Sequence, residues 1–317
     1  MPDIAVIRGG KEEFSLSLSE GQEILKSLSK IGYKPLDVIV DKDGNWTCQG
    51  LPTDAHAIFT RAHTIVDATR NRNAPHIALA KKMGATLFFS KGNDVHMSRE
   101  DMYRLLRMQG FRVPDTTVVR SKAPLQDSFF RDVWSRYHTP LMIRPLARTG
   151  ASGSKLVTQY KDFENSVREY HTKGIDVHVL TYRRLPPSSI VVLPNFRGEK
   201  LYTPIWTETF AGINELPNAS HRIQTYLHAP DFRKEEMKKL ATSVYEALEL
   251  TGPAVIDVIY DNNVYKIVNV ETSPSLRTEG RFMTSLRSTG VDIGQYIHEQ
   301  IRNEVESGIN PLYEFAR

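Results

Sequence analysis

Residues 254–260, Ala-Val-Ile-Asp-Val-Ile-Tyr, and residues 264–270, Val-Tyr-Lys-Ile-Val-Asn-Val, flank a short polar segment, Asp261-Asn262-Asn263. Both apolar runs are rich in β-branched residues, and a polar segment of this length between two such runs is typical of a hairpin turn. We therefore expect two paired strands here. The acidic and amide side chains within them must then lie on defined faces of a sheet.

The relative faces of these side chains depend on the length of the turn. Side chains two apart on a strand share a face, so Asn269 and Glu271 point the same way. If the loop is the three residues 261–263, Asp257 lies opposite Ile267 and joins Asn269 and Glu271 on one face. A two-residue loop would break this parity.

Two carboxylates and an amide oxygen on one face of an apolar hairpin form a set of hard oxygen ligands. Such ligands suit Mg²⁺, so Asp257, Asn269 and Glu271 are candidate metal ligands. The alternative is an ordinary hairpin whose polar face lies in water.

A second pattern places a cation at the end of an apolar strand. The strand Leu141-Met142-Ile143 runs into Arg144-Pro145, and a loop containing Gly150, Ser152 and Gly153 follows. Backbone N–H groups in such a loop can hold a polyphosphate, with the arginine as a neighbouring positive charge. The alternative is a plain Gly/Ser turn.

The remaining chain alternates strands and helices. An apolar strand at 4–7, a helix with a capping-box start at Ser19 and Gln22, and a strand at 36–40 predict a parallel α/β region to about residue 90. Ser98 and Asp101 begin another capped helix. Strands near 178–185, 190–193 and 201–210 follow, with an amphipathic helix before the hairpin. We expect three α/β domains, at 1–90, 91–176 and 177–317.

Composition limits the classes of function. The 317 residues are 40% hydrophobic and 25% charged, and no apolar run approaches the ~20 residues that span a bilayer. A single cysteine, Cys48, excludes an internal disulfide and predicts a cytoplasmic protein. The formal net charge of +4 comes without a nucleic-acid-binding motif. We expect neither a nucleic-acid nor a membrane partner.

Taken in order, these motifs resemble ATP-grasp ligases of the D-alanine–D-alanine ligase family over nearly the whole chain. The order is a glycine turn at 9–10, a capped helix with a cation, the strand–cation–glycine loop, and Asp257 followed by Asn269-Val-Glu-Thr-Ser-Pro. The opening motif of the family is matched, with a one-residue deletion, by Glu13, Ser17, Leu18 and Gly21. The magnesium triad matches with asparagine and glutamate exchanged.

The resemblance implies a fold, cofactors and an activity. It implies the ATP-grasp fold, with a nucleotide cleft between the central and C-terminal domains, and ATP and Mg²⁺ as cofactors. A substrate carboxylate would attack the γ-phosphoryl group, and an amine would displace phosphate from the acyl phosphate to form an amide. A homodimer and a role in peptidoglycan synthesis are also implied. The nucleotide contacts would come from Arg99, Arg144, Gly150, Ser152, Gly153 and Tyr182.

Departures from the family pattern cluster at the adenine and substrate positions. Val255 stands where the family has an arginine, and Gly280 where it has a serine. The adenine-side glutamate is replaced at Leu180 or Thr181. New cations suggest a different carboxylate or a larger anionic substrate. The candidate catalytic and substrate-binding residues are Glu13, Ser17, Arg222, Arg277 and Arg281.

These departures leave other functions open. One alternative is a non-catalytic ATP-grasp paralogue with a structural, regulatory or nucleotide-binding role. A peptide ligase of the glutathione-synthetase type on the same fold is another. Phosphate release from ATP in the presence of both substrates separates an active ligase from a paralogue without activity.

Overall fold

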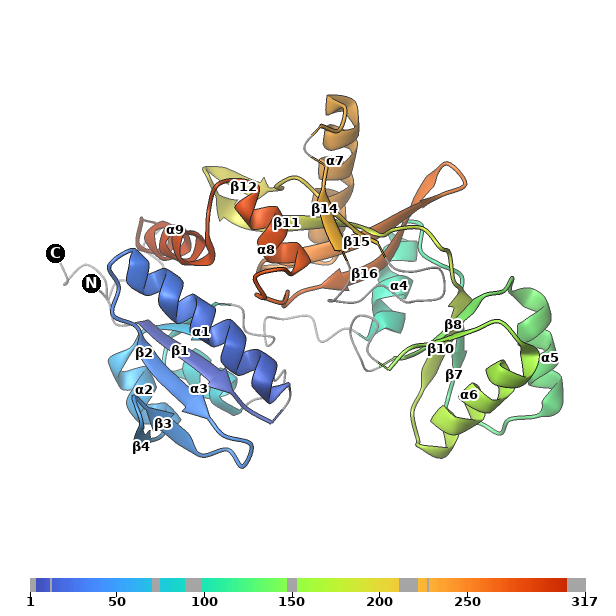
Figure 1. Cartoon of the computed structure of the whole chain (residues 1–317), viewed down its shortest axis with the longest axis horizontal. Helices are drawn as coiled ribbons and strands as arrows, with labels where there is room; N and C mark the ends of the chain where they lie inside the picture. Colours follow the sequence, from blue (N-terminus) through green and yellow to red (C-terminus); the bar gives the residue numbers. More distant parts are fainter. Residues whose placement is uncertain are drawn as a thin grey trace.

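The computed structural model describes residues 4–11, 13–69, 75–88, 98–146, 153–210, 222–226 and 228–306, the last three of these by their backbone alone. Within these residues the strands form three sheets that follow one another along the chain (Figure 1). None of the described helices is both long enough and apolar enough to cross a membrane.

The first sheet has the strand order β4-β3-β2-β1-β5-β6. Its centre is parallel, because β1 pairs with β2 and β5, and β5 pairs with β6. Helix α1 packs on one face, and α2 and α3 pack on the other. The elements are β1 (Ile4–Gly9), α1 (Phe14–Lys30), β2 (Leu36–Val40), β3 (Trp46–Cys48), β4 (Leu51–Thr53), α2 (Ala55–Arg61), β5 (Thr64–Asp67), α3 (Pro75–Lys82) and β6 (Thr86–Phe88).

Helix α1 begins five residues before the predicted capping box. Its N-cap is Glu13, in the left-handed region with φ of 46°, so Ser19 and Gln22 lie inside the helix. Ser98 does cap its helix as predicted, because its hydroxyl accepts a hydrogen bond from the Asp101 amide at 3.1 Å.

The second sheet is antiparallel, with the order β7-β10-β8-β9, and has its own core with α5 and α6. Strand β10 pairs with both β7 and β8. The strand that we placed at the start of a third domain, at 177, therefore belongs to this second sheet. The elements are β7 (Thr117–Val119), α5 (Asp127–Arg136), β8 (Leu141–Pro145), β9 (Lys155–Val157), α6 (Tyr160–Thr172) and β10 (Val177–Thr181).

The third sheet has the order β14-β13-β11-β15-β16, with β12 paired to β11. One face packs against α7 and against α4, and the other face packs against α8, α9 and α1. The elements are α4 (Arg99–Met108), β11 (Ser188–Phe196), β12 (Glu199–Tyr202), β13 (Thr207–Phe210), β14 (Arg222–Thr225), α7 (Asp231–Ala247), β15 (Ala254–Asp261), β16 (Val264–Glu271), α8 (Arg281–Arg287) and α9 (Ile293–Glu306).

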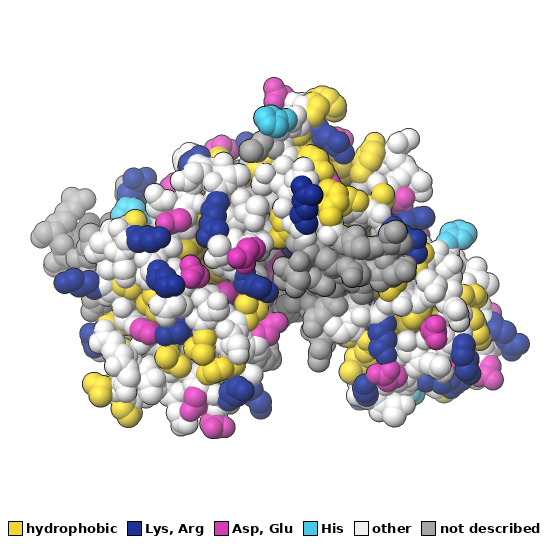
Figure 2. Space-filling model, viewed as in Figure 1, with side chains coloured by type: hydrophobic (Ala, Val, Ile, Leu, Met, Phe, Trp, Pro, Cys, Tyr) yellow, Lys and Arg dark blue, Asp and Glu magenta, His cyan; other side chains and the backbone are white. Residues whose placement is uncertain are grey.

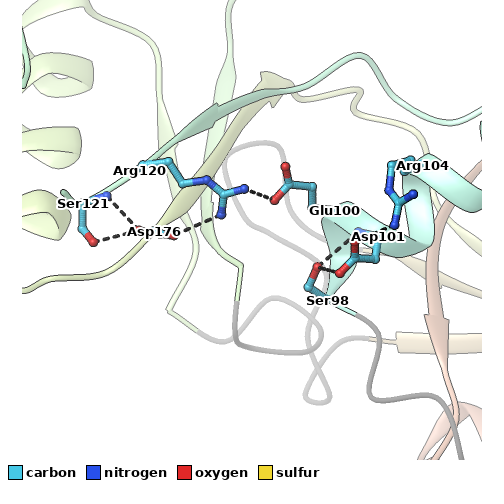
Figure 3. Close-up of polar contacts among 7 residues, drawn as sticks. All are labelled: Ser98, Glu100, Asp101, Arg104, Arg120, Ser121 and Asp176. Atoms are coloured by element: carbon cyan, nitrogen blue, oxygen red, sulfur yellow. Dashed lines mark hydrogen bonds and ion pairs between the residues drawn. The ribbon is translucent and has the colours of Figure 1, made fainter. Parts of the chain in front are cut away.

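Ion pairs connect α4 to the second sheet (Figure 3). Arg120, just after β7, contacts Glu100 of α4 and donates to Asp176 at 3.1 Å. The second oxygen of Asp176 accepts from the amide and the hydroxyl of Ser121, both at 2.7 Å. Because these groups are exposed, the pairs add little stability. They link α4, which packs on the third sheet, to the second sheet.

The surface charges on the face of Figure 2 alternate in sign. Basic and acidic side chains are interspersed there over the described parts of the first and second sheets. This face therefore shows no basic stripe of the kind that tracks a nucleic-acid backbone.

The turn of the β15–β16 hairpin differs from our expectation. The strands end at Asp261 and begin again at Val264, so the loop has the two residues Asn262 and Asn263 rather than three. Both loop residues have positive φ, 52° and 62°. Two consecutive left-handed residues form the turn whose twist matches paired strands, and asparagine tolerates this conformation best after glycine.

A β-bulge restores the face relationship that the shorter loop would have broken. Counting from the turn, Ile267 pairs with Val258, and a regular ladder would next pair Val268 with Asp257. Instead Asn269 pairs with Asp257, and Val268 is the extra residue of the bulge. The predicted pairing of Asp257 with Ile267 was wrong. The expected common face for Asp257, Asn269 and Glu271 is nevertheless present, since Glu271 pairs with Val255, two residues from Asp257.

The turn conformation gives a testable difference between two substitutions. Asn263→Ala should lower the free energy of unfolding by about 1 kcal/mol, because a Cβ-bearing residue without a local hydrogen-bonding side chain is disfavoured in the left-handed region. Asn263→Gly should change it by less than about 0.5 kcal/mol. Urea denaturation of both variants measures this. Equal losses for both would show that the asparagine side chain, and not the backbone conformation, matters.

Candidate functional site

A row of polar side chains crosses one face of the third sheet. Directly paired residues on neighbouring strands share a face, and the pairings run continuously from β14 to β16. The row consists of Thr225, Thr207, Ser189, Asp257 and Asn269. The central members are buried, and the hydroxyl of Thr207 has no hydrogen-bond partner among the described residues. A buried polar row of this kind in an apolar sheet indicates a functional surface.

Asp257 is the centre of this row. Its Oδ1 accepts a hydrogen bond from the Ser189 hydroxyl at 2.7 Å, and its Oδ2 accepts one from the Asn269 side-chain amide at 3.2 Å. Arg281, the first residue of α8, donates from Nη1 to the same Oδ1 at 2.5 Å and from Nη2 to Glu271 at 3.1 Å. One guanidinium therefore bridges both carboxylates.

The charge state of Arg281 follows from two opposing effects. Burial disfavours the charged guanidinium, but the negative charges of Asp257 and Glu271 outweigh it, so the pKa of Arg281 lies above its usual value. Arg281 thus carries a full positive charge. This charge faces both carboxylates of the cluster.

Magnesium, which the family resemblance implies, can be tested against this donor set. The donor types are suitable, being two carboxylates and an amide. As arranged, however, Asp257 Oδ1 already accepts two hydrogen bonds, Asn269 directs its N–H toward Asp257, and Glu271 is paired with Arg281. No group of three or more His, Cys, Asp or Glu side chains able to hold a metal occurs in the part of the chain that the structure describes. The site in this arrangement does not fit a divalent ion.

A second cluster lies where α4 meets the second sheet. Arg144 of β8 is buried and contacts the hydroxyl of Tyr103, and its guanidinium carbon lies 5.7 Å from the centre of that ring. The Tyr103 hydroxyl donates to the carbonyl of Val268, the bulge residue, at 2.8 Å. Arg99 is buried one turn before Tyr103 and donates to the Pro145 carbonyl at 3.2 Å. Both cations expected to contact phosphate therefore lie where α4 meets the end of β8, and Arg144 is joined through Tyr103 to the hairpin.

His178 completes the second cluster. It pairs with Arg144 across the ladder, and its ring stacks on Tyr103 with centroids 5.9 Å apart and planes at 5°. Neither ring nitrogen has a hydrogen-bond partner among the described residues. Burial, together with the positive charges of Arg144 and Arg99, lowers the pKa of His178 to about 3. The imidazole is neutral at physiological pH, so it adds no charge to this cationic site.

The other predicted residues are more scattered. Ser17 is buried, accepts from the Gly9 amide at 2.7 Å and donates to the Ala68 carbonyl at 2.6 Å, so its hydroxyl joins β1 to the end of β5. Glu13 is the exposed N-cap of α1. Tyr182 follows β10 and donates its amide to the Pro140 carbonyl at 2.8 Å.

The loop and surface candidates do not join either cluster through a described contact. Arg222 and Arg277 are exposed, and neither side chain forms an ion pair with a described residue. The Gly153 carbonyl accepts from the Tyr170 hydroxyl. Gly150 and Ser152 lie outside the described residues.

Three functional side chains escaped the sequence interpretation. Tyr103 lies four residues after Arg99 and so shares its helix face, a signal that was available from spacing. Ser189 and His178 could not be found from the sequence, because their roles depend on strand register. Arg281 was expected to bind a substrate carboxylate, whereas the structure pairs it with the chain's own carboxylates.

Comparison with known proteins gives consistent matches. A family model described as the D-ala D-ala ligase C-terminus matches residues 105–302, more than half of the chain. The D-alanine–D-alanine ligase of Pseudothermotoga lettingae is 23% identical over 319 residues, covering 95% of this chain and 99% of that protein.

Solved structures match over nearly the full length. The D-alanine–D-alanine ligase from Bacillus anthracis complexed with ATP has a TM-score of 0.74 and 14% identity, covering 97% of this chain and 98% of that chain. The ligase from Coxiella burnetii has a TM-score of 0.76 and 14% identity, covering 99% and 98%.

The three sheets and their order are those of the ATP-grasp fold, the fold of a class of ATP-dependent ligases. Within this class, the chain belongs to the D-alanine–D-alanine ligase family. Its low identity to the matched relatives marks it as a divergent member.

Stability should depend on pH through His178. His178 takes up a proton with a pKa near 6.5 in the unfolded chain, but with a pKa of about 3 in the folded protein. The stability that the neutral ring contributes is therefore fully present above pH 6.5 and is lost as the pH falls toward 3. Between pH 6.5 and pH 5 the wild type should lose about 2 kcal/mol relative to His178→Phe, which keeps the ring stack and has no titrating group. Urea denaturation at both pH values measures the difference. Parallel losses in the two proteins would contradict a buried neutral imidazole.

Proposed function

We propose that this protein uses ATP to join the carboxylate of one small substrate to the amine of another. The observation that carries the proposal is the convergence of two buried arginines, Arg99 and Arg144, at the junction of α4, the second sheet and the β16 bulge. Phosphate oxygens are strong acceptors for a guanidinium, and two guanidinium groups lie close to each other here. This junction is therefore the proposed phosphate site.

The role of the two arginines is electrostatic. Attack by the substrate carboxylate on the γ-phosphorus forms a new O–P bond and breaks the bond to ADP, which leaves with its electron pair. Arg144 and Arg99 would hold the phosphate oxygens while this charge moves. The amine then attacks the acyl carbon, phosphate leaves, and the amine proton is released. Magnesium would enter with ATP, as part of the substrate complex.

The substrates are proposed to be amino acids or similar small molecules that supply the carboxylate and the amine. Arg222 and Arg277 are exposed cations without an ion pair to a described residue, and they suit the carboxylate of an incoming substrate. Val255 is buried where the family resemblance expects an arginine, so this position supplies no charge to a reacting group. Glu13 is the proposed contact for a substrate amine.

The wider context is likewise proposed from the family. We expect a homodimer assembled through the first α/β domain, acting in the cytoplasm, and a dipeptide product used in peptidoglycan synthesis if both substrates are D-alanine. Light scattering at micromolar concentration tests the first of these. A monomer mass would contradict it.

A substrate screen tests the activity. D- and L-amino acids offered in pairs with ATP and Mg²⁺ should release phosphate above the rate with either amino acid alone, because the acyl phosphate needs the amine to turn over. The alternative, a non-catalytic paralogue, is favoured by Arg281 lying on the carboxylates of the hairpin. This alternative predicts that no pair of amino acids causes phosphate release, whether or not the protein binds ATP.

Nucleotide affinity should depend on Arg144 and not on a matched exposed arginine. Arg144→Met should weaken ATP binding at least about tenfold, the equivalent of losing one charge-assisted contact of about 1.4 kcal/mol. Arg104→Met removes a charge from α4 that pairs only with nearby Asp101 at the exposed surface in the described structure, and should leave the affinity unchanged. Calorimetric titration with ATP measures both. Equal affinities for the wild type and Arg144→Met would contradict the proposed phosphate site.

A further inference from the structure

The hairpin carboxylates have a cation of their own. Asp257 is 7% exposed and Glu271 is 16% exposed, and both lie on the same sheet face. Two carboxylates so placed repel each other and lose hydration, and one of them must gain a proton or both must gain a cation. Arg281 supplies this cation with one planar fork, Nη1 to Asp257 and Nη2 to Glu271.

The position of Arg281 is determined by the core beneath it. The residues that follow it in α8, Phe282, Met283 and Leu286, are buried against the third sheet. Before it, Gly280 donates its amide to the Arg277 carbonyl at 2.8 Å, and a Cβ at residue 280 would come within 3.0 Å of that oxygen. A packed helix and a tight turn therefore deliver the guanidinium to the carboxylates, so the contact is part of the folded structure.

The contact extends into the polar row. Arg281 Nη1 lies 3.2 Å from the Ser189 hydroxyl, which itself donates to Asp257 at 2.7 Å. Asn269 donates to the other Asp257 oxygen. Every residue expected to hold a metal is thus satisfied by protein donors or paired with the guanidinium.

We propose that Arg281 is the resident cation of this site and takes the place of a divalent metal ion at Asp257 and Glu271. The donor set keeps its hard oxygen ligands but uses them to hold a guanidinium within the chain. The inference deepens the proposed function, because it states how the hairpin side of the nucleotide site is neutralised. Its test uses the protein without ATP or amino acids, so it can fail or succeed independently of ligase activity.

The proposal predicts that removing Arg281 creates a metal site. Without ligands, Arg281→Met should bind Mn²⁺ at least about tenfold more tightly than the wild type, because its freed carboxylates need a cation. The electron paramagnetic resonance signal of free Mn²⁺ measures the binding. Arg287→Met is the matched control. Arg287 lies in the same helix, but its guanidinium contacts the Thr278 carbonyl and not the carboxylates. The Arg287→Met protein should therefore bind Mn²⁺ as the wild type does.

Thermal denaturation gives a second readout. In chelator, Arg281→Met should melt about 5 °C or more below the wild type, and millimolar Mn²⁺ should restore most of this loss, whereas the wild type should not respond. The double variant Arg281→Met with Asp257→Asn should melt near the wild type in chelator and lose the Mn²⁺ response. If Arg281→Met does not fold, Arg281→Lys replaces it as the test, because lysine keeps a positive charge but cannot bridge both carboxylates. Mn²⁺ should then raise the melting temperature by a smaller amount.

Two results would overturn the proposal. Tight Mn²⁺ binding by the wild type, abolished by Asp257→Asn, would show that the metal displaces Arg281. An Arg281→Met protein that folds but binds no more Mn²⁺ than the wild type would show that the carboxylates are not a cation site at all.

Discussion

The hydrogen bond from the Tyr103 hydroxyl to the Val268 carbonyl holds the two halves of the candidate site together. Val268 is the extra residue of the bulge and has no register partner on β15, and its carbonyl accepts from α4. The same bulge puts Asn269 opposite Asp257. A single irregularity in β16 thus sets the polar row of the third sheet and also positions the ring on which Arg144 and His178 rest.

Charge balance explains why the two clusters differ. Around Tyr103, the buried guanidinium of Arg144 contacts the tyrosine hydroxyl and lies beside a neutral histidine, and neither of these groups carries negative charge. Around Asp257, the carboxylates meet Arg281, and most of the negative charge is compensated within the chain. The first cluster is therefore the candidate site for an anion, while the carboxylates of the second are paired with a guanidinium of the same chain.

Local patterns in the sequence predicted the hairpin, the Ser98 cap and the cation at the end of β8, because each depends on residues close together in the chain. The common face of Asp257 and Asn269 was expected only for a three-residue loop, whereas the loop has two residues and the common face is present because a bulge compensates. The alternation of apolar residues in the sequence does not reveal where a bulge occurs. Contacts such as Arg281 with Asp257 or His178 with Tyr103 depend on how distant elements pack, which periodicity does not encode.

The distribution of the cores has a mechanical consequence. One continuous apolar cluster includes Ile4 and Leu28 of the first region together with Val191, Val255 and Tyr296, so the first and third sheets share a core. The second sheet has a separate apolar cluster and meets the rest at α4, through exposed ion pairs and through the contacts of Arg144 and His178 with Tyr103. Amide hydrogens of β8 and β10 should accordingly exchange through an opening that leaves β1 and β11 protected. The second sheet then behaves as a separate cooperative unit hinged on a rigid two-sheet body, and any closing over a bound molecule would be its movement.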